Sequence, residues 1–129
     1  MRYLLDTHTL YWWVYFPELL PHKVRDILSD PDVTSFVSAV SAYEMSYKYH
    51  RGRWSEIAGL VAAFEELVEA EKFALLPLSA KHATRAGEYP REHRDPFDRM
   101  LAAQAVVEGL ALVSKDGWLK GMGAEVVWG

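Results

Sequence analysis

Short apolar runs alternate with longer stretches of helical spacing along the chain. The apolar runs predict buried strands at Tyr3–Leu5, Val33–Val37, Phe73–Leu76, Leu110–Val113 and Glu125–Trp128. The longer stretches predict helices from Thr7 or Thr9 to Phe16, over Pro21–Ser29, from Ser38 or Ser41 to near Gly52, from Ser55 through Val68, over Ser79–Ala86 and over Pro96–Glu108. Pro17 and Gly109 are typical residues for the ends of two of these helices.

This alternation of strands and helices predicts an α/β fold with three layers. A mostly parallel central sheet would carry helices on both faces. The chain has 129 residues and no repeat or Gly/Ser linker, so we expect one domain over residues 1–129. Ligands of such sheets bind beyond the carboxyl ends of the strands, and the residues at those ends are therefore the candidate site.

Composition narrows the class of protein. The chain has no cysteine, which excludes disulfides and thiolate chemistry and fits a reducing compartment. Its longest apolar run, Leu10–Phe16, is too short to cross a membrane, and no leader peptide is recognisable, so we expect a cytoplasmic protein. The formal charge of -4 argues against a protein that coats nucleic acid without specificity.

Carboxylates follow several of the predicted strands. Asp6 ends the first strand, Glu44 lies in the helix after the second, and Asp116 follows the late strand Leu110–Val113. Asp95 and Asp98 open the helix that leads into that late strand. A parallel sheet would bring these acids to one edge, where hard oxygen ligands would suit Mg²⁺ or Mn²⁺.

Each acid also has a purely structural explanation. Glu44 forms a capping-box pattern with Ser41 and is spaced for an ion pair with Lys48. Asp95 is a good helix N-cap, and Asp98 would be the third residue of that helix. Asp6 and Asp116 could be turn residues, and the pair Asp116-Gly117 could close a hairpin. These local explanations give no reason for acids to recur at the same sheet edge, whereas a divalent metal site does.

Other chemistries lack sequence support. The histidines form no zinc-binding H-E-x-x-H pattern. The chain has neither a G-x-x-x-x-G-K-[ST] nor a G-x-G-x-x-G phosphate loop, and no G-x-S-x-G nucleophile elbow. Two alternatives stay open at this point. One is a phosphate-handling α/β protein, such as a receiver-like phosphoacceptor, and the other is a non-enzymatic binding module whose acids only cap helices and turns.

Four stretches together resemble the PIN-domain ribonucleases, in particular VapC-type toxins of type II toxin–antitoxin pairs. They are LLDTHTLYWW, SFVSAVSAYEMSYKYHRG, HRDPFDRMLAAQA and LALVSKDGWL, in the family's order and over essentially the whole chain. HRDPFDR is the most specific and is typical of an H-x-D-P-F-D-R subgroup. The resemblance implies a PIN-like fold, a metal-dependent endoribonuclease (a hydrolase), a VapB-type antitoxin partner and a homodimer.

The resemblance also implies roles for individual residues. Metal ligation falls on Asp6, Asp98 and Asp116, and Glu44 completes the catalytic set. Asp95 is an additional carboxylate of the subgroup, which we expect around the ligands or as an alternate ligand. We expect the hydroxyls of Thr7 and Ser114 to orient the carboxylates. Many family members carry threonine where Ser114 stands, and both residues supply a hydroxyl.

Two further groups of residues suggest binding surfaces. Basic residues flank the acids and are candidate contacts to RNA phosphates: Lys48, Arg51, Arg53, Arg94 and Arg99. The aromatic segment Tyr11–Phe16 is apolar around most of a helix, so some of its rings should be exposed in a single chain. We therefore expect this helix to contact a second copy or a partner.

Overall fold

A five-stranded parallel sheet forms the centre of the molecule. The computed structural model describes residues 1–129, and its strand order is β3-β2-β1-β4-β5. The strands are β1 (Arg2–Leu5), β2 (Thr34–Ser38), β3 (Ala74–Leu76), β4 (Ala111–Val113) and β5 (Glu125–Val127). All four pairings are parallel, with Leu5 opposite Val37 on one side and Val113 on the other. The predicted strands are confirmed to within one residue at each end.

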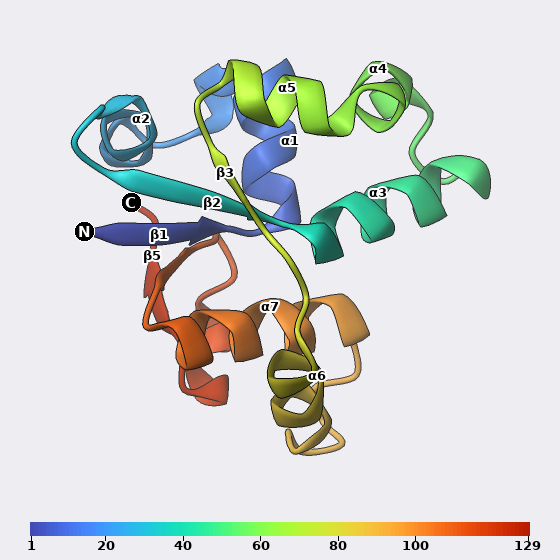
Figure 1. Cartoon of the computed structure of the whole chain (residues 1–129), viewed down its shortest axis with the longest axis vertical. Coiled ribbons are helices and arrows are strands. Elements are labelled where there is room, and N and C mark those ends of the chain that lie inside the picture. The colour runs from blue at the N-terminus through green and yellow to red at the C-terminus, as the bar shows by residue number, and fades with distance from the viewer.

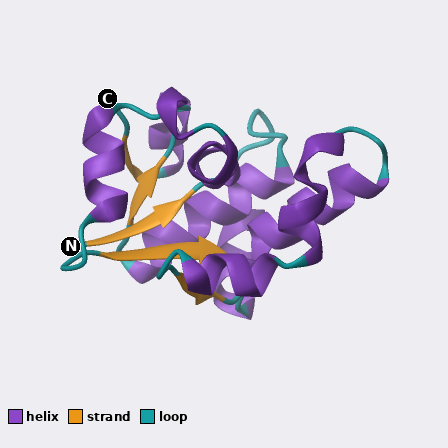
Figure 2. Cartoon of the chain, turned by 90° about the horizontal axis from the view of Figure 1, so that it is seen from above, coloured by secondary structure: helices purple, strands orange, loops and turns teal.

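Helices cover both faces of this sheet (Figures 1 and 2). The α-helices are α1 (Thr7–Tyr15), α2 (His22–Ser29), α3 (Ala39–His50), α4 (Ala58–Ala62), α5 (Phe64–Ala70), α6 (Ala80–Gly87) and α7 (Pro96–Glu108). Short 3₁₀ turns lie at η1 (Pro17–Leu19), η2 (Ser55–Ile57) and η3 (Gly117–Met122). Figure 1 shows α1, α2, α4 and α5 on one side of the sheet and α6 and α7 on the other. The predicted three-layer α/β fold is confirmed.

Side chains of the central strands alternate between two hydrophobic cores. Leu5 and Val113 belong to the core under α1, α2 and α5, whereas their neighbours Leu4 and Leu112 belong to the core under α7. All four side chains are fully buried. A strand buried on both faces reads as a continuous apolar run, which is why LLD and LALV are uniformly hydrophobic up to the strand ends.

The helices differ from the sequence predictions in two places, the cap of α1 and a break in the helix expected from Ser55. Asp6, rather than Thr7 or Thr9, caps α1, because its carboxylate accepts a hydrogen bond from the Thr9 N–H at 2.8 Å. Ser38, one of the two predicted residues, caps α3. The single helix expected from Ser55 is divided into η2, α4 and α5, with a break at Ala63.

The topology excludes a receiver fold and a hairpin at Asp116-Gly117. The order β3-β2-β1-β4-β5 differs from the 2-1-3-4-5 order of receiver proteins. The segment after Asp116 forms η3 and leads to β5, which pairs parallel to β4, so Asp116-Gly117 does not close a hairpin. No helix of the structure is long and apolar enough to span a membrane.

Arg99 fastens the loop between α6 and α7. Its guanidinium donates hydrogen bonds to five backbone carbonyls, those of Ala86, Gly87, Tyr89, Pro90 and His93. These bonds use all three guanidinium nitrogens, in place of the phosphate contact expected for Arg99. Asp95 ends this loop as the N-cap of α7, and Asp98 lies in the first turn of that helix, so Arg99 acts on the site through the backbone that leads to it.

We expect Arg99→Lys to destabilise the chain although the positive charge is kept. Lysine cannot reproduce a planar fork with five donors, and hydrogen bonds to charged groups contribute roughly 1.5–3 kcal/mol each before the loop relaxes. We therefore expect the free energy of unfolding, measured with urea, to fall by about 2 kcal/mol or more. The matched control is Arg91→Lys, an exposed arginine of the same loop, which should change stability by less than about 0.5 kcal/mol. Equal stability of the two variants would contradict the structural role.

Candidate functional site: an acidic cavity at the carboxyl edge of the sheet

The predicted acids meet in one small cavity of about 120 Å³. It is lined by Asp6, Thr7, His8, Glu44, Lys48, Asp95, Asp98 and Asp116, with no hydrophobic residue among them. Asp6 follows β1, Asp116 lies beyond β4, and Glu44 is on the helix after β2. These strands are neighbours and run parallel, so their carboxyl ends bring together residues that are far apart in the sequence.

Asp6 is, with Glu44, one of the two deeply buried acids of the cavity. Only 6% of its surface is exposed, and this burial raises the pKa of its carboxyl group. Hydrogen bonds from Ser114 and Thr9 oppose the rise because they favour the charged form. The Thr9 hydroxyl also donates to the Val113 carbonyl at 2.8 Å, which ties the start of α1 to the end of β4.

Glu44 is buried and only half of its carboxylate is satisfied. Its Oε2 accepts from the Lys48 ammonium at 2.5 Å, whereas its Oε1 is buried without any hydrogen-bond partner. The capping-box interpretation of Glu44 is wrong, because α3 begins at Ala39 and the Ser41 hydroxyl instead lies 2.9 Å from that of Thr7. The expected Glu44–Lys48 ion pair is present, but it faces the cavity and not open solvent.

Asp98 is a second acid of the cavity whose ionisation is perturbed. Burial, followed by the negative charges of Asp95, Asp6, Glu44 and Asp116, raises its pKa to about 7. Asp95 has the capping role expected for it, since its carboxylate accepts from the Phe97 and Asp98 N–H groups at 2.8 and 3.3 Å. Both acids therefore belong to the first turn of α7, and both also face the cavity.

Ser114 connects the two acids that follow β1 and β4. Its buried hydroxyl accepts from the Asp116 N–H at 3.0 Å and also hydrogen-bonds the Asp6 side chain. Asp116 itself is exposed at the rim. Thr7 is joined to Ser41 at the start of α3. The hydroxyls of Ser114 and Thr7 thus link the segments that carry the acids.

The side chains of the cavity suit a divalent cation. No three His, Cys, Asp or Glu side chains stand in an arrangement that would by itself hold a metal ion. The donor set nevertheless consists of carboxylate oxygens, which hard cations prefer. The unpartnered Oε1 of Glu44 and the raised pKa of Asp98 both indicate negative charge that lacks a positive counterpart. The residues present therefore fit a bound divalent cation.

The predicted basic residues have different surroundings. Lys48 lies in the cavity beside Glu44, and Arg53 is exposed in an adjoining hollow. Arg51 stacks on Tyr47, with its guanidinium carbon 3.6 Å from the ring centroid. Arg94 is exposed directly before Asp95. The Arg99 guanidinium is occupied by hydrogen bonds to carbonyls of the loop between α6 and α7.

Two features near the cavity were not expected from the sequence. His8 lines the cavity from α1, and its exposed ring stacks on Trp54 with a centroid distance of 5.2 Å. The buried Gln104 of α7 accepts from the Ser38 hydroxyl at 2.5 Å and donates to the Pro77 carbonyl. Ser38 caps α3, so Gln104 links the helix that carries Glu44 to the helix that carries Asp98. The sequence did carry a signal for the role of Gln104, because it is a polar residue inside the apolar run LAAQA.

The aromatic segment of α1 is mainly packed inside the molecule. Tyr11 donates to Glu56, Trp13 donates to Glu71, and the Tyr15 hydroxyl accepts from the Leu60 N–H. The rings of residues 11–15 are half-buried against the core, and only Phe16 is exposed. Part of the apolar surface that was expected to be exposed on this helix is therefore covered within the chain, by residues of η2 and α4 and by the residue after α5.

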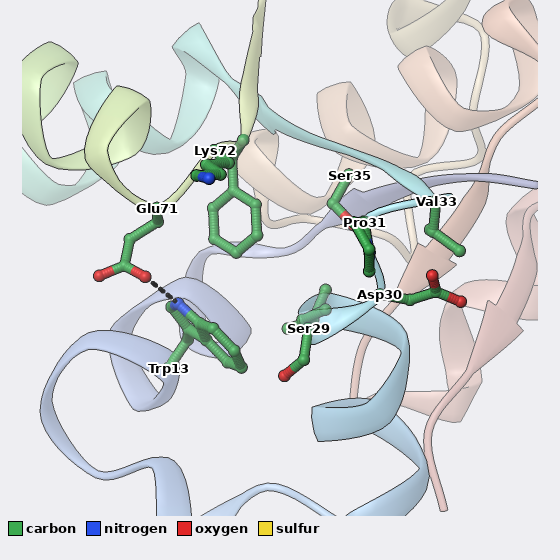
Figure 3. A pocket seen from close by; sticks show the side chains of 10 residues that line it. Trp13, Ser29, Asp30, Pro31, Val33, Ser35, Glu71 and Lys72 are labelled. Atoms are coloured by element: carbon green, nitrogen blue, oxygen red, sulfur yellow. Dashed lines mark hydrogen bonds between the residues drawn. The ribbon is translucent and has the colours of Figure 1, made fainter.

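A larger cavity, of about 450 Å³, lies away from the acidic one (Figure 3). It includes Asp30, Val33 and Ser35 around the start of β2, whereas the acids gather beyond the strand ends. Figure 3 shows Trp13 hydrogen-bonded to Glu71 across one side of it. The catalytic candidates all belong to the smaller cavity.

Comparisons with known proteins agree with this architecture. Ribonuclease VapC22 of Mycobacterium tuberculosis (strain ATCC 25618 / H37Rv) is 28% identical over 118 residues, which are 91% of this chain and 88% of that protein. VapBC2 from Rickettsia felis, solved bound to a promoter DNA fragment, superposes with a TM-score of 0.74 at 18% identity over 100% of both chains. DNA-bound VapBC from Salmonella typhimurium superposes with a TM-score of 0.72 at 18% identity, over 98% of this chain and 97% of that one.

Similarity to these solved structures establishes a shared fold. The assignment of a family comes from the sequence, which matches the PIN domain family over residues 3–123. That match contains the first four strands except Arg2, all seven α-helices and every residue that lines the acidic cavity. The chain belongs to the PIN domain family.

Proposed function

We propose that this chain is a metal-dependent endoribonuclease that hydrolyses RNA phosphodiester bonds as the toxin of a toxin–antitoxin pair. The observation that carries the proposal is the convergence of five carboxylates on one small polar cavity, with an unpartnered oxygen on Glu44. Membership of the PIN family and likeness to a protein named Ribonuclease VapC22 support the same activity.

Asp6, Asp98 and Asp116 would hold the metal, with Mg²⁺ or Mn²⁺ as the ion that suits their oxygens. When bound, such a cation makes water more acidic and offsets the charge that develops on the phosphate. Asp95, which already caps α7, would keep the first turn of that helix in place and add to the negative field. Ser114 would hold Asp6 and Asp116 in their relative positions.

Glu44 would act as the proton acceptor. Glu44 lines the cavity, its Oε1 has no hydrogen-bond partner, and Lys48 holds the other oxygen. As water attacks phosphorus, Glu44 would take its proton, a new P–O bond would form, and the bond to the leaving ribose oxygen would break. The leaving oxygen then takes up a proton. No covalent intermediate with the chain is required.

The proposal includes two protein partners, a VapB-type antitoxin and a second copy of this chain. Its support is the likeness of the fold to chains solved in VapBC assemblies from three bacteria. Besides Met1, the large hydrophobic side chains that this chain leaves exposed are Phe16, Leu19, Tyr43, Leu75, Leu78 and Trp118. These residues are available for such contacts.

Removal of divalent cations should abolish RNA cleavage. The purified chain is incubated with a total cellular RNA pool in Mg²⁺, in Mn²⁺ and in EDTA, and the fragments are separated by size. We expect defined fragments with either cation and intact RNA with EDTA, because the acids alone cannot offset phosphate charge. Cleavage that persists in EDTA would contradict the metal dependence. No cleavage under any condition, with a folded chain, would favour a binding module.

Asp98→Asn should have opposite effects on stability and on activity. Without metal, the Asp98 carboxyl keeps its proton up to a pKa of about 7 in the folded chain but loses it near the ordinary value of 3.8 when unfolded. The folded state thus binds more protons between these values, so its stability falls as pH rises from about 4 to about 7. Asparagine does not ionise and so removes this loss of stability. At pH 8 and without metal, we expect a higher melting temperature for Asp98→Asn than for the wild-type chain.

The same variant should lose RNA cleavage, because it lacks one of the charges that hold the metal. The control is Asp26→Asn, an exposed acid of α2, which should change neither property appreciably. If Asp98→Asn cleaved RNA at the wild-type rate, Asp98 would be only a helix residue, and Asp95 would become the candidate ligand.

Glu44→Gln separates a catalytic role from a structural one. Glutamine keeps the size of the side chain and can still contact Lys48, so we expect a melting temperature close to that of the wild type. The loss of a proton acceptor should lower the cleavage rate by roughly 10²–10⁴-fold. Both values are measured on the same preparation with saturating Mg²⁺. A cleavage rate within a few-fold of the wild-type rate would contradict a catalytic role for Glu44 and would leave aspartates as the only catalytic acids.

A further inference from the structure

The acidic cavity continues into a second hollow on the same surface. This second hollow has a volume of about 330 Å³ and is lined by His8, Tyr11, Lys48, Arg53, Trp54 and Glu56. His8 and Lys48 line both hollows. We call the second one the aromatic hollow. Because the two share these side chains, a chain of nucleotides whose phosphate lies among the acids would place an adjacent nucleotide in the aromatic hollow.

The aromatic hollow offers a stacking surface. The His8 ring lies against Trp54 at 5.2 Å and 27°, and Tyr11 meets the same indole edge-on at 5.0 Å. Trp54 is buried beneath them, whereas His8 is exposed. The stacked indole, together with edge contacts from Tyr11 and Trp12, orients the imidazole, which stays exposed to solvent. A flat aromatic ring held in this way is a platform for an unpaired base.

The aromatic hollow also carries positive charge beside the acids. The backbone N–H of Arg53 donates to the Lys48 carbonyl, but its exposed side chain has no hydrogen bond or ion pair within the chain, so the guanidinium is free to bind a phosphate. Lys48 lies between the two hollows, 5.8 Å from the centroid of the Trp54 ring. A phosphate beside the acid cluster needs such cations, since the acids repel it.

One acid, Glu56, also lines the aromatic hollow. Its Oε1 accepts a hydrogen bond from the Tyr11 hydroxyl at 2.9 Å. A carboxylate next to a stacked base can accept from an exocyclic amino group, which adenine, cytosine and guanine have and uracil lacks. Glu56 is thus compatible with a nucleotide in the hollow and would favour bases that carry an amino group.

We propose that the aromatic hollow is the binding subsite for the unpaired nucleotide next to the scissile phosphate. In this subsite the base stacks on His8, and Arg53 binds the backbone phosphate. The substrate would therefore be single-stranded RNA at the cut. A base inside a duplex cannot leave its stack to reach the imidazole without unpairing. The inference rests on the proposed function and adds the residues that would hold the nucleotide beside the cut.

Equilibrium binding tests the subsite without requiring turnover. All variants are made in the Asp98→Asn chain, and binding is followed by fluorescence anisotropy with two labelled probes. One is a random-sequence single-stranded RNA decamer, and the other is a decamer of abasic ribose phosphates. We expect His8→Ala to weaken binding of the RNA decamer by roughly 5- to 150-fold, the effect of one lost base stack. It should leave the abasic decamer unaffected.

Two further variants separate stacking from charge. His8→Phe keeps a flat ring and should restore most of the RNA binding. Arg53→Gln should weaken both decamers alike and make their binding less dependent on salt. The matched controls are His22→Ala and Arg25→Gln, the same types of change at exposed positions of α2, which should alter neither affinity appreciably.

Base-independent binding would overturn the subsite. That result would be an equal effect of His8→Ala on both decamers, or no effect on either. If the wild-type chain still cleaves RNA, the proposed activity stands and only the subsite is lost. If binding depends on the base and on His8 but the wild-type chain does not cleave, the subsite stands and the proposed activity is wrong.

Discussion

Repulsion among the carboxylates that surround Asp98 is the interaction on which the rest of the site depends. Asp6, Glu44, Asp95 and Asp116 all raise the pKa of Asp98, and burial adds the largest contribution. The cavity is small, and Asp6 and Glu44 are buried in it, so water screens these charges poorly. A fold that gathers these acids must hold them against their repulsion or supply a cation. This arrangement lowers stability in a way that selection for folding alone would remove.

Several contacts hold the acids where they repel one another. The parallel strands β1, β2 and β4 bring their carboxyl ends to one edge. The Ser114 hydroxyl joins the segments of Asp6 and Asp116, and Gln104 joins the cap of α3 to α7. Arg99 fastens the loop before Asp95. These contacts tie the backbone on which the carboxylates stand. The same edge also carries His8, Lys48 and Arg53, so the acids and the groups that would bind RNA share one groove.

The sequence predicted the fold more completely than the surroundings of individual residues. Buried strands such as LALV can be recognised in the sequence as apolar runs. The convergence of the acids follows from the parallel topology. The catalytic roles of those acids stay proposals. The structural role of Arg99 could not be predicted. Its partners are backbone carbonyls of a loop, and no local sequence pattern gives the path of that loop. The break at Ala63 is hidden for a similar reason, since the apolar spacing continues through it. His8 lacked a signal because its stacking partner, Trp54, is far along the chain.

Calorimetric titration of the metal-free chain with Mn²⁺ tests most directly whether the acid cluster exists to hold a cation. It is carried out at pH 6.5 in two buffers that differ in ionisation enthalpy, so that proton release can be separated from binding. Asp98 is largely protonated at this pH, because its pKa lies at about 7. Our account predicts saturable binding with the release of up to about one proton per chain. It also predicts that Asp98→Asn reduces both the affinity and the proton release. A folded chain that binds no Mn²⁺ at millimolar concentration would contradict the account.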